Sequence, residues 1–398
     1  MAEPPSILSP EPAILFTAFE PSGDDHASAV IAELRARYPD LVMYAWGGPK
    51  MAAAGAQVIE RTGEDAVMGV PGIKKISEHR AINGRIRKWL EDHRITVHVP
   101  VDSPAANFPV CRLTKAHGAK VVHLVAPQLW AWGSWRARKL RRLTDRVLCL
   151  LPFEEAWFKA KDIPAEFVGH PLFDRPVNGE AIAQTLKDIP EGSPRVLLLP
   201  GSRPAEIGKN FPLLLDAFVE LSRTRPDLRG LIAVTTPQVE GRIRDLTQSR
   251  LGKWPERLHL VSGATDAAIA WCDLALVVSG TVKLQVAKQH KPMVIVYKSN
   301  PVAYAMVGWW VIDTEFFALP NLIAGKEIVP ELIPHFGDHQ PIVDAASVLL
   351  SDPAKAEAQR SELQRVTAMF QGRNAAESAA TAIARECGLD ENGQDDLL

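Results

Sequence analysis

The chain has 398 residues, more than one hydrophobic core usually organises, so two domains of ordinary size are expected. Apolar residues make up 46% and charged residues 23%, which is typical of a globular protein and excludes a disordered one. The 45 Lys and Arg residues nearly balance the 47 Asp and Glu residues, and the net charge of -2 argues against nucleic acid as a partner.

Cysteine usage and the N-terminal sequence indicate the compartment. The four cysteines form no CxxC pair, and three of them lie in or beside apolar segments, as expected of buried thiols in a reducing compartment. The first residues lack the basic start and apolar core of a signal peptide, and no apolar run is long enough to span a bilayer. We therefore expect a cytoplasmic protein that meets a membrane only at its surface.

The first part of the chain alternates short apolar runs with helical patterns. Its first apolar run breaks at Pro21-Ser22-Gly23-Asp24 before a helical pattern resumes. Strands are predicted at residues 13–18, 41–46, 96–101, 120–125, 146–151 and 165–168, and helices at residues 27–38, 82–92 and 110–117. This alternation predicts a parallel sheet with helices on both faces.

The alternation restarts after residues 174–194, a polar stretch with Pro and Gly that marks a domain junction. Strands are predicted at residues 196–200, 228–235, 258–261, 274–278 and 293–297, and helices at residues 211–223, 237–251, 264–271 and 281–289. The predicted fold class is therefore α/β, with two Rossmann-like doubly wound domains that bind ligands at the carboxyl ends of their strands.

The C-terminal part is helical by pattern over residues 345–387, with a break at Asp352-Pro353 and an acidic tail after it. We expect these helices to cross back to the first domain. The predicted domains are residues 1–174, residues 175–345, and the C-terminal helices and frayed tail over residues 346–398.

One turn in the second half carries residues suited to a diphosphate. Gly201, Ser202 and Arg203 follow a predicted strand and therefore lie at its carboxyl end. Glycine lets backbone approach a ligand, serine offers a hydroxyl, and the planar guanidinium of Arg203 matches phosphate oxygens. An ordinary strand-to-helix turn with a surface arginine has the same local sequence, so this turn alone does not decide.

A second turn of the same kind, Ser279-Gly280-Thr281, follows another strand and precedes a helical pattern. Free N–H groups at a helix start favour anions, so the two turns together fit a nucleotide diphosphate better than either does alone. The chain has no GxxxxGK[ST] motif, and no GxGxxG motif follows the first strand. These absences argue against an ATP or GTP hydrolase and against a dinucleotide oxidoreductase.

Acidic and histidine side chains lie at strand ends in the first half. Asp102 follows a predicted strand and is a candidate general base, although an aspartate before Ser-Pro is also a common turn or cap residue. Glu20 and Asp24 flank the first turn, and His170 follows a short strand, each with a capping or core alternative. No set of His, Cys and carboxylate residues has metal-ligand spacing, so a reaction without a metal is expected.

A basic run over residues 135–142 places five positive charges in eight residues. Such a run suits phosphates or anionic lipid head groups, although a solvated helix face has the same composition.

The order of the motifs resembles the lipid-A-disaccharide synthase family over nearly the whole chain. Each matching segment is short, but all of them occur in the family's order. They are Glu20-Pro21-Ser22-Gly23-Asp24, Gly48-Pro49-Lys50-Met51, Val67-Met68-Gly69-Val70, Asp102-Ser103-Pro104, Ala126-Pro127-Gln128-Leu129-Trp130-Ala131-Trp132, Leu151-Pro152-Phe153-Glu154, Val168-Gly169-His170-Pro171, Leu199-Pro200-Gly201-Ser202-Arg203, Ser279-Gly280-Thr281 and Leu319-Pro320-Asn321-Leu322-Ile323-Ala324-Gly325.

The resemblance implies a GT-B fold and an inverting glycosyltransferase. Such an enzyme transfers diacylglucosamine from its UDP donor to diacylglucosamine 1-phosphate without a metal or cofactor. Asp102 would take the acceptor proton, while Arg203 and the helix start at Ser279-Gly280-Thr281 would stabilise the departing UDP. Asn321 would line the donor site. The acceptor side would include Glu20, Ser22, Gly23, Asp24 and His170.

Several positions depart from the family pattern. Gln285 replaces the usual glutamate and can still bond a ribose hydroxyl, but without charge. Phe19 replaces a glycine, and Ala105 replaces an aspartate. The family's apolar membrane segment, here residues 70–79, keeps few apolar residues and would rely on Lys74 and Lys75 to bind the inner face of a membrane.

These departures leave two alternatives open. One is a diverged glycosyltransferase that uses another UDP-sugar and a less lipidic acceptor. The other is a non-catalytic UDP-sugar-binding or scaffold protein, against which the presence of Asp102 argues. The resemblance also suggests a homodimer formed through the C-terminal helices.

Overall fold

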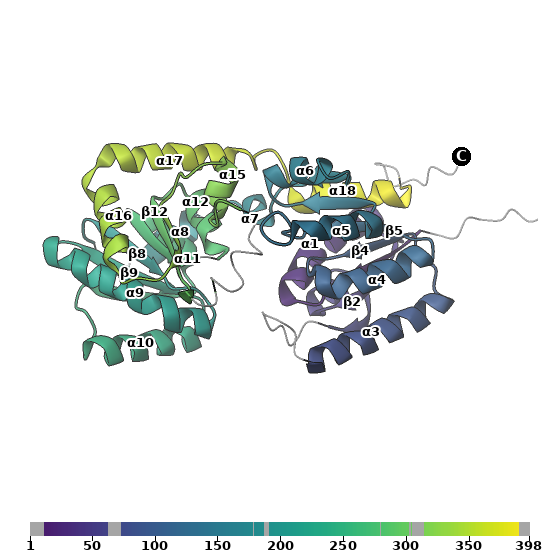
Figure 1. The fold of residues 1–398 in the computed structure, drawn as a ribbon, viewed down its shortest axis with the longest axis horizontal. Helices are drawn as coiled ribbons and strands as arrows, with labels where there is room; N and C mark the ends of the chain where they lie inside the picture. The colour runs from purple at the N-terminus through teal and green to yellow at the C-terminus, as the bar shows by residue number, and fades with distance from the viewer. Residues whose placement is uncertain are drawn as a thin grey trace, which may run out of the picture. The chain divides into compact units, whose positions relative to one another are not determined.

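The computed structural model describes residues 12–62, 73–177, 179–186, 191–278, 280–301, 304 and 314–389. The chain forms two compact units, each of which is a parallel α/β structure, as the alternation of strands and helices predicts (Figure 1). Unit 1 comprises Met1–Asp174 and Gly372–Leu398, and unit 2 comprises Arg175–Gln371.

Unit 1 is built on a seven-stranded sheet in the order β3-β2-β1-β4-β5-β6-β7, with parallel pairing throughout. Ile14 and Phe16 of β1 pack into one apolar cluster and Leu15 into another, so helices cover both faces. A strand buried on both faces needs a continuous apolar run, which β1 has. The strands are β1 Ala13–Thr17, β2 Val42–Gly47, β3 Gln57–Arg61, β4 Val97–Pro100, β5 Lys120–Leu124, β6 Arg146–Cys149 and β7 Ala165–Phe167.

The helices of unit 1 begin earlier than the sequence pattern predicts. The first helix begins at Pro21 and the fourth at Pro104, because proline has the backbone angle of a first helical residue. The helices are α1 Pro21–Arg37, α2 Pro49–Ala53, α3 Ile73–Asp92, α4 Pro104–Ala116, α5 Ala137–Leu143 after the 3-10 turn Ser134–Arg136, α6 Pro152–Lys159, α7 Pro171–Asp174 and α18 Ala375–Cys387.

Unit 2 has a six-stranded sheet in the order β10-β9-β8-β11-β12-β13, again with parallel pairing. Successive residues of β8, such as Leu197 and Leu198, pack into different apolar clusters. Each fully buried aliphatic side chain of this kind contributes about 1.5–3 kcal/mol. The strands are β8 Arg195–Leu199, β9 Arg229–Val234, β10 Leu258–Ser262, β11 Leu274–Val278, β12 Met293–Lys298 and β13 Glu331–His335.

The helices of unit 2 include two that the sequence pattern does not predict, α8 within the polar junction and α15 after residue 318. None of the described helices of either unit is both long and apolar enough to cross a membrane. The helices of unit 2 are α8 Gly179–Leu186, α9 Pro204–Thr224, α10 Pro237–Leu251, α11 Thr265–Trp271, α12 Val282–Lys288, α15 Leu319–Ala324, α16 Gln340–Ser351 and α17 Pro353–Ala368.

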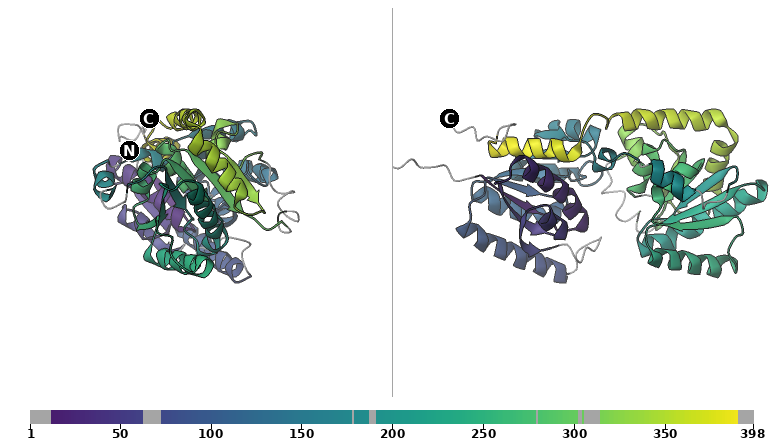
Figure 2. Two further views of the ribbon diagram at one scale, coloured as in Figure 1. Left: turned by 90° about the vertical axis from the view of Figure 1, so that its left-hand side faces the viewer. Right: turned by 180° about the vertical axis from the view of Figure 1, so that it is seen from behind.

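The last helix, α18, returns to unit 1 and packs beside α1, whereas α16 and α17 belong to unit 2 (Figure 2). The Asp174 carboxylate accepts hydrogen bonds from the backbone amide of Ala375 at 3.0 and 3.1 Å, which fixes the start of α18. Near its end, Glu386 pairs with Arg146 of β6 at 3.0 Å. The helix therefore completes the first core from the far end of the chain.

Candidate active site

Each sheet has one switch point, where the chain connections on either side run in opposite directions. It lies between β1 and β4 in unit 1 and between β8 and β11 in unit 2. Ligands of parallel α/β sheets bind at the carboxyl ends of the strands beside such a point. Glu20 and Asp102 follow β1 and β4, and Gly201 and Gly280 follow β8 and β11. These four predicted residues thus lie at the two switch points.

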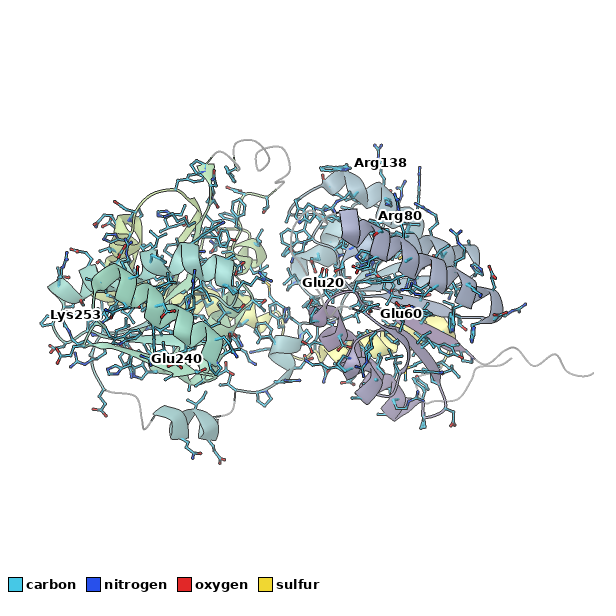
Figure 3. All side chains as sticks on the ribbon, turned by 90° about the horizontal axis from the view of Figure 1, so that it is seen from below. Glu20, Glu60, Arg80, Arg138, Glu240 and Lys253 are labelled. Carbon is cyan, nitrogen blue, oxygen red and sulfur yellow. The ribbon has the colours of Figure 1, made fainter. Side chains whose placement is uncertain are left out.

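Asp102 and Glu20 come together at the switch point of unit 1, where Figure 3 labels Glu20. The Ser103 hydroxyl donates a hydrogen bond to Glu20 Oε1 at 2.8 Å. Burial raises the pKa of the Asp102 carboxyl; a backbone hydrogen bond from Ser103 opposes this shift, and the nearby Glu20 charge adds to it. A carboxylate with a raised pKa is a stronger base, so Asp102 is suited to take a proton from a hydroxyl.

The backbone at Asp102 and Ser103 is strained. Their φ angles are 48° and 35°, in the left-handed region that side chains other than glycine rarely occupy. Each such residue costs on the order of 1 kcal/mol and persists only where its surroundings hold it. One contact that holds this turn is the hydrogen bond from the Asp102 amide to the carbonyl of Leu124 on β5, at 2.9 Å. The strained turn lies between the end of β4 and the start of α4 at Pro104.

The Asp24 carboxylate is occupied by the backbone at the start of α2. It accepts hydrogen bonds from the amides of Gly48 at 3.1 Å, Lys50 at 3.1 Å and Met51 at 3.0 Å. A Cβ at position 48 would lie 2.3 Å from Asp24 Oδ2, so this approach requires glycine. Asp24 therefore stabilises the turn that leads into α2, and the structure does not bring it together with Asp102.

Ser22 and Gly23 lie in the first turn of α1, after Glu20 at its N-cap position. Ser22 is exposed and Gly23 is buried. A Cβ at position 23 would lie 3.0 Å from Cβ of Ala18, so Gly23 allows the helix to pass close to the end of β1. Of these two residues, only Ser22 has a side chain that a ligand can reach.

His170 lies just before α7, and its Nδ1 accepts a hydrogen bond from the Leu172 amide at 3.1 Å. Burial, together with the nearby His26, lowers the pKa of His170 to about 4. Burial also lowers the pKa of His26, although the charge of the nearby Asp25 acts to raise it. Both rings are neutral near pH 7, which suits hydrogen bonding better than proton transfer. The proximity of His26 to His170 was not predicted, because nothing in the local sequence relates α1 to the residues after β7.

The turn that the sequence suggests for a diphosphate lies between β8 and α9. Gly201 has a φ angle of 93°, which requires glycine, and Ser202 and Arg203 are exposed before the first turn of α9. Arg203 Nη1 lies 3.0 Å from Glu206 Oε1, one turn into the helix. A ligand phosphate would therefore meet a guanidinium that is already held at the helix start.

The second turn is described only in part. Ser279 lies outside the described residues, whereas Gly280 and Thr281 are exposed at the start of α12. Gln285 is partly exposed one turn later. A helix start carries only a partial positive charge, so Arg203 supplies a larger charge than the start of α12 does.

Asn321 is fully occupied within unit 2. Its amide group donates to the carbonyl of Val329 and to Glu331 Oε2, both at 2.9 Å. Its oxygen accepts from the amides of Ile328 at 2.8 Å and Val329 at 2.9 Å. These bonds use both donors and both lone pairs. In this structure Asn321 holds the connection from α15 to β13 and has no hydrogen bond left to offer a ligand.

Three residues near the second site were not predicted from the sequence. The Glu331 carboxylate accepts hydrogen bonds from the amides of Phe317 at 2.9 Å and Ala318 at 2.8 Å. Lys283 is buried in α12, and burial lowers its pKa to about 8. Burial also raises the pKa of Tyr297. The charge of Glu206 raises this pKa too, and that of Arg203 lowers it. No motif marks these residues, because only tertiary packing brings Lys283 of α12 near Glu331 of β13, and Tyr297 of β12 near Glu206 and Arg203.

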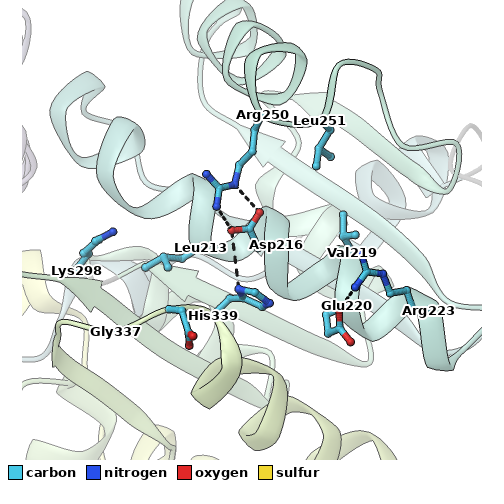
Figure 4. Close-up of a pocket in the computed structure, with 11 residues that line it drawn as sticks. Leu213, Asp216, Val219, Glu220, Arg223, Arg250, Leu251, Lys298, Gly337 and His339 are labelled. Atoms are coloured by element: carbon cyan, nitrogen blue, oxygen red, sulfur yellow. Dashed lines mark hydrogen bonds and ion pairs between the residues drawn. The ribbon is translucent and has the colours of Figure 1, made fainter.

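A pocket of about 590 Å³ lies on another part of unit 2, along α9 and the end of α10 (Figure 4). Asp216 on its wall forms an ion pair with Arg250, and His339 Nδ1 lies 3.9 Å from the same carboxylate. Its charged groups largely pair with one another, and it does not include the residues of the two predicted turns. Among the described residues, no group of three or more His, Cys, Asp or Glu side chains is placed to hold a metal ion.

Comparisons with solved structures agree with this fold. A glycosyltransferase of kitacinnamycin aligns with a TM-score of 0.60 at 18% identity, over 95% of this chain and 100% of its own. A complex of S. aureus MnaA with UDP aligns with a TM-score of 0.60 at 12% identity, over 95% of this chain and 96% of its own. Similarities at this identity show the shared two-domain fold.

Sequence comparisons show the family. The model of the family described as lipid-A-disaccharide synthetase matches residues 14–385. The lipid-A-disaccharide synthase of Alcanivorax borkumensis is 34% identical over 378 residues, which cover 94% of this chain and 97% of that protein. The enzyme of the same name from Geobacter sulfurreducens is 32% identical over 359 residues, covering 89% and 91%. The chain therefore belongs to the lipid-A-disaccharide synthase family and is a glycosyltransferase.

Proposed function

We propose that the chain transfers diacylglucosamine from UDP-diacylglucosamine to diacylglucosamine 1-phosphate and so forms the lipid A disaccharide. The observation that carries this proposal is the half-buried Asp102 at the switch point of unit 1, with its pKa raised by burial. Family membership supports the choice of donor and acceptor.

The reaction is a single displacement with inversion. The 6'-hydroxyl oxygen of the acceptor attacks the anomeric carbon of the donor, and Asp102 takes the hydroxyl proton as the new bond forms. The bond from the anomeric carbon to the diphosphate breaks, and UDP leaves with the electron pair. Arg203 and the backbone amides at Gly280 and Thr281 stabilise the charge that develops on the diphosphate. In this proposal side chains and backbone supply that stabilisation, with no metal or cofactor.

The remaining predicted residues have supporting roles. Gln285 bonds a ribose hydroxyl of the nucleotide, and Ser202 adds a hydroxyl to the diphosphate turn. Asn321 shapes the donor site by holding the connection from α15 to β13. On the acceptor side, Glu20 tunes Asp102, and His170 offers a neutral imidazole to a polar group of the acceptor.

The acceptor and donor carry acyl chains, so we propose that the protein acts at the cytoplasmic face of a membrane. Of the membrane segment suggested by the family, residues 70–79, residues 70–72 lie outside the described residues and the rest belongs to α3. Another surface of unit 1 also fits this role, and we name it the aromatic–basic surface. It is formed by Trp132, Trp135, Arg136, Arg138 and Arg142.

The aromatic–basic surface combines two features of membrane contact. Trp132 is 48% exposed and Trp135 is 65% exposed, and the Arg136 guanidinium lies 3.9 Å from the ring centroid of Trp132. Residues 126–144 contain five Arg and Lys residues and no Asp or Glu. Tryptophan favours the lipid interface, and each basic residue there adds about 1 kcal/mol of attraction to anionic lipids. This loop follows β5, at the same edge of the sheet as Asp102.

We also propose a homodimer formed through the C-terminal helices. The long helices α17 and α18 flank the return of the chain to unit 1, and Met369 between them is 48% exposed. The concentration dependence of mass in analytical ultracentrifugation tests this assembly.

The decisive experiment incubates the purified protein with UDP-diacylglucosamine and diacylglucosamine 1-phosphate and detects the disaccharide by mass spectrometry. Asp102→Asn is expected to lower kcat about 10²- to 10⁴-fold while UDP still binds. Unchanged turnover in this variant would overturn the role of Asp102. Bound UDP without any disaccharide would favour a diverged glycosyltransferase with other substrates or a non-catalytic protein. Full activity in EDTA is expected.

A further inference from the structure

A buried chain of hydrogen bonds runs beneath Asp102. Its members are Thr17 at the end of β1, His98 of β4, and Asn107 and Thr114 of α4, and all four side chains are fully buried. The Thr114 hydroxyl lies 3.0 Å from His98 Nδ1, and His98 Nε2 lies 2.8 Å from the Thr17 hydroxyl. The Thr17 hydroxyl in turn donates to Asn107 Oδ1 at 2.7 Å. Buried polar groups of this kind are costly unless they are satisfied, and these are.

This chain of hydrogen bonds ends at the backbone carbonyls of Val101 and Asp102, which lie on either side of the Asp102 amide and α-carbon. The side-chain amide of Asn107 donates to the carbonyl of Val101 at 3.0 Å and to the carbonyl of Asp102 at 2.9 Å. Both donors of Asn107 are therefore spent on the turn that carries the Asp102 carboxylate. Two carbonyls are fixed by one rigid planar group, which restricts the rotation of the backbone between them.

Only one direction of donation satisfies every member of the chain. The Thr17 proton is committed to Asn107 Oδ1, so the Thr17 oxygen must accept from a proton on His98 Nε2. The His98 Nδ1 is then an acceptor for the Thr114 hydroxyl. Burial lowers the pKa of His98 to about 3, so the ring stays neutral and keeps this single tautomer. The amide of Asn107 thus has one fixed orientation, with its donors toward the turn.

We propose that Asn107 is a positioning residue, which holds the strained Asp102–Ser103 turn so that the Asp102 carboxylate stays aimed at the acceptor hydroxyl. Residues at φ angles of 48° and 35° return to ordinary backbone angles unless they are held. The carboxylate is attached to this backbone and would move with it. A displacement of about 1 Å at a reacting group costs on the order of 10²-fold in rate. The inference rests on the proposed role of Asp102 and extends it to a residue that touches no substrate.

Asn107→Leu tests this role, because leucine has a similar size and removes both donors. We expect kcat to fall on the order of 10²-fold, as for a misplaced base, with the KM and the affinity for UDP nearly unchanged. The acid limb of the pH profile should move to lower pH, because a relaxed turn exposes the Asp102 carboxyl to water and burial no longer raises its pKa as much. Asn107→Ser keeps one donor and should lie between the wild type and Asn107→Leu.

Thr114→Val is the matched control. It removes the far end of the same buried chain, at His98 Nδ1, and leaves the three hydrogen bonds of Asn107 in place. We expect a lower melting temperature with a wild-type kcat and pH profile. If Thr114→Val lowers kcat and shifts the profile as Asn107→Leu does, the effect is one of general stability, and the positioning role is overturned.

A readout that does not need activity separates this inference from the proposed function. The Asp102 carboxyl can be titrated by carbon-13 NMR, with Asp102→Asn to assign its signal. A lower Asp102 pKa in Asn107→Leu than in the wild type supports the positioning role even if the wild-type protein makes no disaccharide. An identical Asp102 titration in the two folded proteins overturns it, whatever the activity of the wild type.

Discussion

The hydroxyl of Ser103 donates a hydrogen bond to the Glu20 carboxylate at 2.8 Å, and so links the ends of two neighbouring strands at the switch point of unit 1. Through this link the Glu20 charge stays close to Asp102, whose pKa it raises. The two carboxylates therefore have different roles. Glu20 accepts the Ser103 hydrogen bond, and Asp102, whose pKa burial raises, is the base of the proposed reaction.

Glu20→Gln should shift the acid limb of the kcat/KM profile to lower pH. Removing a neighbouring negative charge lowers the pKa of Asp102, so the base remains ionised further into the acid range. The measurement is transferase activity as a function of pH. Ser103→Ala is the control, because it removes the hydrogen bond but keeps the charge. A shift to lower pH in Ser103→Ala as large as that in Glu20→Gln would show that the hydrogen bond, and not the charge, sets the profile.

Arg203→Ala should weaken UDP binding roughly ten- to a hundredfold in isothermal titration calorimetry, because a hydrogen bond to a charged group contributes about 1.5–3 kcal/mol. Its melting temperature should stay near that of the wild type, since the exposed pair with Glu206 adds little stability. Arg223→Ala is the matched control. It breaks the same kind of pair, with Glu220, at the other end of α9. Equal UDP affinity in both variants would contradict the diphosphate site.

Replacing Trp135 by Ala and Arg138 by Glu together should reduce binding to vesicles that contain anionic lipid. The change removes an interfacial ring and reverses one charge of the aromatic–basic surface, where each charge contributes about 1 kcal/mol (Figure 3). Cosedimentation with vesicles at low and physiological salt measures the effect. Lys253→Glu, on an exposed loop of unit 2, controls for net charge. Undiminished binding in the double variant would leave residues 70–79 as the proposed contact.

Asp24→Ala should destabilise unit 1 more than it slows catalysis. It leaves three backbone amides at the start of α2 without their acceptor, and each unsatisfied buried donor costs about 1–3 kcal/mol. Chemical denaturation measures the loss. Asp25→Ala, at the exposed neighbouring position, should change stability by less than about 0.5 kcal/mol. A stable Asp24→Ala variant with weak acceptor binding would return Asp24 to the substrate side.

The sequence predicts the strands of both sheets well, because a strand buried on two faces needs a continuous apolar run. It misses β3 and β13, which are less buried and lie at or near a sheet edge, so their residues alternate or mix with polar ones. The same reasoning places the start of α4 at Val110, six residues late, because its first turn begins at a proline and has no large apolar residue. Local apolar patterns identify buried segments and leave their ends less certain.

For the site, strand ends identify where ligands bind, but not how each side chain is used. Asp102 and Gly201 follow strands, which places them at the carboxyl edge of each sheet, and the strand order then places them at the switch points. Asp24 and Asn321 have the residue types of a binding site, yet their hydrogen bonds go to groups of this protein that lie at least 24 and at least 7 residues away, respectively. Those partners are set by tertiary packing, which a motif does not encode. Asn107 was missed for the same reason.

The return of α18 to unit 1 determines the order in which this protein can fold during synthesis. Ala379, Ala380 and Ile383 belong to the same apolar cluster as Ile14 and Phe16. The ribosome makes the whole of unit 2 before these residues emerge, so the second unit can complete its core while the first still lacks a covering helix. Truncation after residue 371 would therefore damage the part of the protein that is made first.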